Sequence, residues 1–202
     1  MKNLVILFQG DSVTDCNRRI HDDYGEGYVH EISKNYPNHT IINRGISGNK
    51  TSDLFARWQK DTMDFTPDIL CILIGINDVW HRYAFGTGET ITDYENYYRK
   101  MLEQVKEKLP KTFIIMMEPF MFTVDDFQRS FRKDLDEEIQ VTRMLAREFA
   151  DEYIPLDGFL AEQALKYNEF DLLHDGIHPT VKGHSLIAKE VINRIDKLII
   201  KL

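Results

Sequence analysis

The chain has 202 residues, of which 43% are hydrophobic, and this is enough for a single domain over residues 1–202 with a substantial core. The formal net charge of -8 disfavours nucleic acid and anionic membrane surfaces as partners and favours a neutral small-molecule substrate. No stretch approaches a membrane span in length, and the first apolar run is too short for the core of a signal peptide. The only cysteines are Cys16 and Cys71, and Cys71 lies in an apolar run, so we expect a cytoplasmic protein without disulfides.

The first part of the chain alternates between strand-like and helix-like patterns. An apolar run over 4–7, ended by a glycine shortly after it, is typical of a buried strand. Apolar residues then recur at helical spacing over 28–36, and a second β-type run covers 40–43. Thr51 or Ser52 can cap the helix that follows. The order to this point is β-α-β-α.

The most continuous apolar run covers residues 68–74 and predicts the central strand. Thr92 and Glu95 form a capping box for a helix that ends at Pro110. The remaining pattern predicts a strand over 113–117, a long stretch over 118–132, a helix over 135–149, an edge strand over 153–156, and helices over 160–167 and 186–198. Five strands separated by helices predict a parallel sheet covered on both faces, with the loops after the strands meeting at one edge.

Ser12 follows the first predicted strand in the sequence Gly10-Asp11-Ser12. A serine at the carboxyl edge of a sheet can act as a nucleophile if a base and oxyanion donors reach it from elsewhere in the chain. An aspartyl phosphatase would need a second carboxylate two residues after Asp11, and Val13 occupies that position. We therefore expect Asp11 to structure the loop and Ser12 to carry the chemistry.

A candidate base lies just before the terminal helix, where Asp175 and His178 are three positions apart. A carboxylate at this spacing can hold one imidazole nitrogen and leave the other free to take a proton from Ser12. The alternative is a turn with an incidental histidine. A metal site built on His174 and His178 is disfavoured because zinc needs at least a third protein ligand, and neither a cysteine pair nor H-E-x-x-H occurs.

Two loops offer candidate oxyanion donors. Asn77 follows the third predicted strand and can aim its amide at a negatively charged oxygen, although a loop asparagine can equally satisfy its own turn. Gly48 follows the second strand and lets the backbone approach a substrate oxygen with its N–H. Neither G-x-G-x-x-G nor a Walker motif is present, so the sequence does not predict a nucleotide-binding loop.

Taken together, these blocks resemble the GDSL, or SGNH, hydrolases over residues 4–188. The resemblance implies Ser12 as nucleophile, His178 as base and Asp175 as third member of the triad. It also implies an oxyanion hole made by the N–H groups of Ser12 and Gly48 and the side-chain amide of Asn77. The implied fold is a flavodoxin-like three-layer α/β/α sandwich with a five-stranded parallel sheet, and no metal or organic cofactor is implied.

Within that family, residues 43–49, 56–58 and 74–80 look most like those of intracellular carbohydrate acetyl esterases, particularly acetylxylan esterases acting on xylo-oligosaccharides. Trp80, close to Asn77, could provide an aromatic surface for a sugar ring. Trp58 could provide a second surface or belong to the core of its helix. Phe120 could wall the pocket or pack beneath a long loop.

The expected activity is hydrolysis of O-acetyl esters of small carbohydrates through an acyl-enzyme intermediate. Lipid or thioester acyl hydrolysis on the same triad is the first alternative, because catalytic residues do not choose the acyl chain. The second is a carbohydrate-binding relative that has lost turnover. The loop with Gly86 and Gly88, or the apolar end at 198–200, could form a contact in a homo-oligomer.

Overall fold

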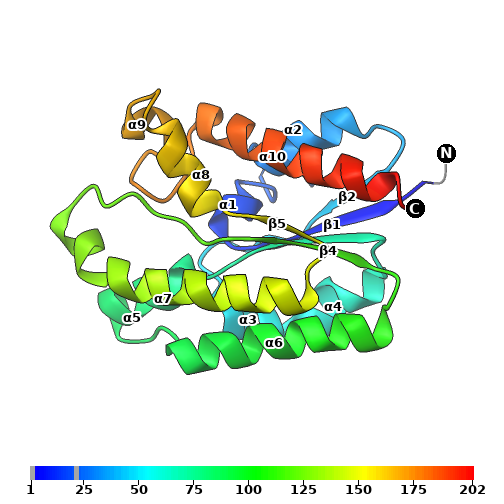
Figure 1. Ribbon diagram of the computed structural model, residues 1–202, viewed down its shortest axis with the longest axis horizontal. Coiled ribbons are helices and arrows are strands. Elements are labelled where there is room, and N and C mark those ends of the chain that lie inside the picture. The colour runs from blue at the N-terminus through cyan, green and yellow to red at the C-terminus, as the bar shows by residue number, and fades with distance from the viewer. Residues whose placement is uncertain (1–2, 21–22) are drawn as a thin grey trace.

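The computed structural model describes residues 3–20 and 23–202, in which five parallel strands form a sheet between two layers of helices (Figure 1). The strand order is β2-β1-β3-β4-β5, the flavodoxin-like order, which confirms the predicted fold class with β3 in the centre and β5 at an edge. The strands are β1 (Val5–Gly10), β2 (Thr40–Asn43), β3 (Ile69–Leu73), β4 (Phe113–Met117) and β5 (Glu152–Ile154).

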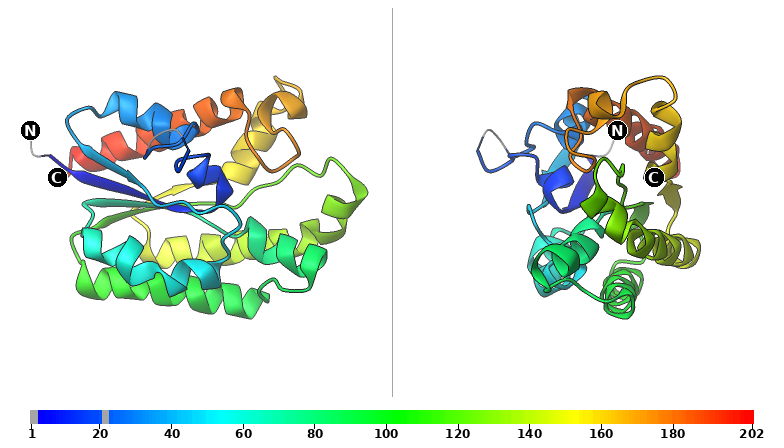
Figure 2. Two further views of the ribbon diagram at one scale, coloured as in Figure 1. Left: turned by 180° about the vertical axis from the view of Figure 1, so that it is seen from behind. Right: turned by 90° about the vertical axis from the view of Figure 1, so that its left-hand side faces the viewer.

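Helices cover both faces of the sheet, as the two views of Figure 2 also show. One layer contains α1 (Ser12–Asp15), α2 (Tyr28–Asn35), α8 (Leu156–Gln163), α9 (Glu169–Leu172) and α10 (Val181–Ile199). The other contains α3 (Thr51–Ala56), α4 (Trp58–Asp61), the 3-10 helix η1 (Met63–Phe65), α5 (Ile76–Phe85), α6 (Ile91–Lys108) and α7 (Asp126–Phe149).

The central strands supply side chains to both layers. Alternate residues of a strand point to opposite faces, so Cys71 packs in the core beneath α2 and α10, whereas Leu70 and Ile72 pack in the core beneath α3 and α6. Both cores are fully buried at β3, which is why the sequence of this strand is apolar without alternation. Cys16 and Cys71 are both free thiols.

Several helix starts differ from the prediction. Helix α8 begins at Leu156 and not at 160, and α10 begins at Val181 and not at 186. Helix α6 is capped by Thr90, whose hydroxyl accepts from the Asp93 N–H, and not by Thr92. Neither Thr51 nor Ser52 caps α3, which begins after Lys50.

Helix α7 begins earlier than the predicted helix over 135–149, within the stretch 118–132 for which no helix was predicted. The side chain of Asp125 accepts from the Gln128 N–H and caps it at Asp126. The helix is therefore 24 residues long and extends beyond the edge of the sheet.

Trp58 is a core residue, and its predicted role as a sugar surface is wrong. Its side chain is 1% exposed and packs with Leu54 and Leu70 in the layer of α3 and α6. Ser12 begins α1 on the opposite face of the sheet, so Trp58 does not reach a substrate there.

Replacing Trp58 with alanine should lower the free energy of unfolding by about 3–5 kcal/mol, because it leaves a large cavity in a packed core. Trp58→Phe fills most of that space and should cost less. Urea unfolding followed by circular dichroism measures both effects. An unchanged free energy of unfolding in Trp58→Ala would contradict the assignment of Trp58 to the core.

Candidate active site

Ser12 is positioned by the turn that joins β1 to α1. Strand β1 ends at Gly10, and the side chain of Asp11 caps α1 by accepting the Val13 N–H at 3.0 Å. Burial raises the pKa of Asp11 to about 6, against the opposing effect of that hydrogen bond. Asp11 therefore structures the turn, as predicted, and leaves the Ser12 side chain at the carboxyl end of the strand.

Ser12, His178 and Asp175 form a continuous chain of hydrogen bonds. Ser12 Oγ lies 3.0 Å from His178 Nε2, and His178 Nδ1 lies 2.7 Å from Asp175 Oδ2. The carboxylate can only accept, so Nδ1 carries a proton and Nε2 of the neutral ring accepts from the serine hydroxyl. The other carboxylate oxygen accepts the backbone N–H groups of Ile177 and His178, which fixes the carboxylate against the ring.

This arrangement separates the pKa values of the two ionisable groups. Partial burial opposes ionisation of Asp175, but hydrogen bonds from the His178 side chain and from two backbone N–H groups outweigh it and hold the pKa of this carboxyl well below its usual range. The hydrogen bond to Asp175 raises the pKa of His178 above its ordinary value, although desolvation opposes the shift. His178 is thus a stronger base than a free imidazole.

Asn77 contacts the loop of Gly48 through Asn49, the residue that follows Gly48. Asn77 lies in the first turn of α5, directly after β3, and its Nδ2 donates to the Asn49 carbonyl oxygen at 3.1 Å. Gly48 has φ of +82°, a conformation that favours glycine, and open space surrounds the position of its missing Cβ. The amide of Asn77 retains a second N–H that can bind an oxygen.

Strands β1 and β3 are neighbours in the sheet. The chain leaves β1 toward α1 on one face of the sheet and leaves β3 toward α5 on the other face. Ser12 follows β1 and Asn77 follows β3. This is the topological switch point, where open α/β folds bind ligands.

Several residues that hold these loops were not singled out from the sequence. Asp15 Oδ2 accepts from the backbone N–H and hydroxyl of Ser47 at 3.0 and 2.7 Å, which joins α1 to the loop before Gly48. Arg57 donates to the Gly10 carbonyl oxygen and to Asn49 Oδ1, and thereby joins β1 to the same loop. The contacts of Asp15 with Ser47 and of Arg57 with Gly10 join segments far apart in the chain, which no local pattern predicts.

A cavity of about 380 Å³ opens beside Ser12 and His178, between the end of α1 and the start of α10. The ring of Trp80 is partly exposed, and its centroid lies 6.2 Å from that of His178. Phe120 is 3% exposed and packs beneath Asp11 against a space of about 10 Å³, too small for a ligand. The proposed contact of Phe120 with substrate is therefore wrong, because neighbouring side chains cover its ring.

Within residues 3–20 and 23–202, no group of three or more His, Cys, Asp and Glu side chains is placed to hold a metal ion. None of the helices in these ranges combines the length and apolar character needed to cross a membrane.

The sequence was compared with protein families and curated proteins. The model of the GDSL-like lipase/acylhydrolase family matches residues 8–186. An acetylxylan esterase of Geobacillus stearothermophilus is 31% identical over 206 residues, which cover 94% of this chain and 93% of that protein. The similarity therefore extends over nearly the whole of both chains.

Solved structures give the same result. A protein from Parabacteroides merdae described as a GDSL-like lipase has a TM-score of 0.87 at 36% identity, over 93% of both chains. A catalytic mutant of the Geobacillus acetylxylan esterase has a TM-score of 0.86 at 28% identity, over 96% of this chain and 95% of that one. The catalytic mutants of that enzyme replace a serine, an aspartate or a histidine, the last two spaced as Asp175 and His178 are here.

With most of its length matched by the family model, the chain belongs to the GDSL-like lipase/acylhydrolase family and is a carboxylic ester hydrolase.

Proposed function

We propose that this protein removes acetyl groups from small carbohydrates, in particular from acetylated xylo-oligosaccharides. The observation that carries the proposal is the hydrogen-bonded chain from Ser12 through His178 to Asp175. The substrate class is supported by the similarity to an acetylxylan esterase over 94% of the chain. The formal charge of -8 is compatible with a neutral sugar ester.

In the proposed first half-reaction, Ser12 Oγ attacks the acetyl carbonyl carbon while its proton passes to His178 Nε2. The negative charge on the carbonyl oxygen is stabilised by the N–H groups of Ser12 and Gly48 and by Asn77 Nδ2. The tetrahedral intermediate then collapses, the bond to the sugar oxygen breaks, and His178 returns the proton to that oxygen. The products are the free sugar hydroxyl and acetyl-Ser12.

In the second half-reaction, His178 takes a proton from water, which attacks the acetyl-Ser12 carbonyl. Collapse of this intermediate releases acetic acid, and the proton held by His178 returns to Ser12 Oγ. Asp175 stays ionised throughout, since its pKa lies far below neutrality, and stabilises the imidazolium that forms in each half-reaction. No other reactant than water is needed.

Further elements of the proposal concern binding and location. Trp80 contacts the bound substrate, which is supported by its partly exposed ring beside His178. A cytoplasmic location is supported by the two free cysteines, because unpaired thiols are compatible with a reducing compartment.

The first prediction concerns the nucleophile. Wild-type protein should release acetate from acetylated xylo-oligosaccharides and cleave p-nitrophenyl acetate faster than p-nitrophenyl octanoate, whereas Ser12→Ala should lose nearly all turnover of each substrate and keep its fold. Ser130→Ala, an exposed serine on α7, is the matched control. Faster cleavage of the octanoyl ester would favour the lipid acyl hydrolase alternative, and no turnover by wild type would favour a non-catalytic relative.

The second prediction concerns the oxyanion. Asn77→Ala should lower kcat by roughly 10²- to 10³-fold with little change in KM, the effect of removing one donor that acts in the transition state. The control is Asn35→Ala, an exposed residue at the end of α2. An effect limited to KM would show that Asn77 binds the ground state of the substrate instead.

The third prediction is the pH dependence. Attack by Ser12 needs neutral His178, so kcat/KM should fall as pH drops through the pKa of His178, in an acid limb centred above its ordinary value of 6.5. Asp175→Asn removes the partner that raises this pKa, and NMR titration of the imidazole should then give a lower value. An unchanged pKa would contradict the coupling between the two side chains.

A further inference from the structure

We propose that the cavity beside Ser12 is the subsite for the alcohol part of the ester, an uncharged sugar, and that Glu26 disfavours anionic alcohols there. This assignment rests on the proposed function, because it divides the substrate of that reaction between the two sides of Ser12. The cavity volume of about 380 Å³ lies within the roughly 300–1,000 Å³ that small-molecule sites occupy. It is large enough for the sugar part of the substrate.

The direction of proton transfer determines which part of the ester enters the cavity. The leaving sugar oxygen must receive its proton from His178 Nε2, so the alcohol has to lie against His178. His178 and Ser12 both line the cavity, whereas Gly48 and Asn77 lie outside its lining. The carbonyl oxygen therefore points away from the cavity, and the alcohol points into it.

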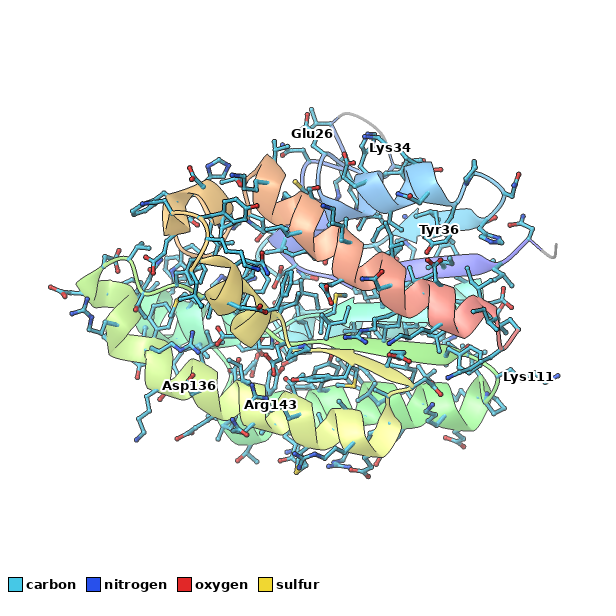
Figure 3. All side chains as sticks on the ribbon, turned by 45° about the horizontal axis from the view of Figure 1, so that its top comes forward. Glu26, Lys34, Tyr36, Lys111, Asp136 and Arg143 are labelled. Carbon is cyan, nitrogen blue, oxygen red and sulfur yellow. The ribbon has the colours of Figure 1, made fainter. Side chains whose placement is uncertain are left out.

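The far wall of the cavity is polar. Asn17, Glu26 and His174 line it and are exposed, and Asn17 Nδ2 donates to Glu26 at 2.9 Å. Figure 3 shows Glu26 on the loop before α2. Amide, carboxylate and imidazole groups offer both donors and acceptors to the hydroxyls of a sugar, and a hydrocarbon chain would leave them unmatched.

This wall is held in place from behind. Cys16 and Asn17 have φ values of +36° and +65°, an unusual conformation for two successive residues that carry side chains. The Glu26 N–H donates to the Cys16 carbonyl oxygen at 2.7 Å, which fixes the loop of Glu26 to the end of α1. Strained residues persist only where their surroundings hold them, and they cluster at functional sites.

A buried histidine supports the same wall. His184 is 6% exposed, and its Nδ1 accepts the Tyr28 N–H at 3.1 Å, so Nε2 carries the proton and faces Cys16 Sγ at 3.4 Å. Burial lowers the pKa of His184 to about 4, and the ring is therefore neutral at pH 7. Glu26 thus brings an acidic side chain to this wall, and the neutral His184 behind the wall brings no charge.

The test compares three acetyl esters that differ only in the alcohol: ethyl acetate, acetylated xylobiose and acetylated glucuronic acid. Asn17→Gly removes the side chain at a residue whose φ glycine adopts without strain, and the ratio of kcat/KM for acetylated xylobiose to that for ethyl acetate should fall about five- to tenfold. Glu26→Gln should raise kcat/KM for acetylated glucuronic acid relative to acetylated xylobiose about fivefold, the effect of one charge at close range in water.

Glu31→Gln, an acidic residue on α2 that is not part of the cavity lining, is the matched control and should change neither ratio. If Asn17→Gly and Glu26→Gln both leave these kcat/KM ratios unchanged and still cleave acetylated xylobiose, the subsite is overturned and the proposed function stands. A changed preference between ethyl acetate and ethyl butanoate would overturn it too, by placing the acyl chain in the cavity. Wild-type protein without activity on acetylated xylobiose would reject the function and the subsite together.

Discussion

The guanidinium of Arg57 joins the segments that carry the candidate oxyanion donors. Its Nη1 donates to the side chain of Gln9 and to the Arg44 carbonyl oxygen, its Nη2 to the Gly10 carbonyl oxygen and its Nε to Asn49. Partial burial lowers the pKa of Arg57, and a cation removed from water is tolerated only when its donors are satisfied. These partners are the end of β1 and the loop after β2, so one buried charge fixes the distance between the segments that carry Ser12 and Gly48.

The buried carboxyl group of Asp78 completes this support from the side of Asn77, with a second buried carboxyl group, Glu138, near it. Asp78 accepts both the N–H and the hydroxyl of Thr51, which joins the start of α5 to the start of α3. Burial raises the pKa of Asp78 to about 7 despite these hydrogen bonds, and it raises the pKa of Glu138 far above its usual range, with the nearby Asp78 adding to the shift. Neither carboxyl oxygen of Glu138 has a hydrogen-bond partner among the described residues. A buried carboxyl group without partners reduces stability, whereas the hydrogen bonds from Thr51 to Asp78 position the start of α5, which carries Asn77.

The sequence predicts those features that depend on local pattern. Apolar runs ended by glycine or proline located all five strands, and the residues after them identified Ser12, Gly48 and Asn77, because parallel strands bring their carboxyl ends to one edge. Local pattern does not fix the start of α6, because Thr90 and Thr92 each precede an acidic residue by three positions and either could be the N-cap. In the structure Thr90 is the N-cap. Trp58 was ambiguous because a large aromatic residue suits a core and a binding site equally. Arg57 lies in the block 56–58 of the resemblance, but its contacts with Gln9, Gly10 and Arg44 were not predicted because these residues lie in other segments of the chain.

The loop of Asp175 and His178 is supported by α7 and by the segment that follows β4. Gln128, in the first turn of α7, donates to the Asp175 carbonyl oxygen, and the Phe122 N–H donates to the Gly176 carbonyl oxygen at 2.8 Å. Gly176 has φ of +85°, and a Cβ there would lie 2.5 Å from the Phe122 carbonyl oxygen, so only glycine lets the two segments approach. The part of α7 that extends beyond the sheet therefore has a function that the apolar pattern could not show. Together with the loop of Phe122, it holds the candidate base within hydrogen-bond distance of Ser12.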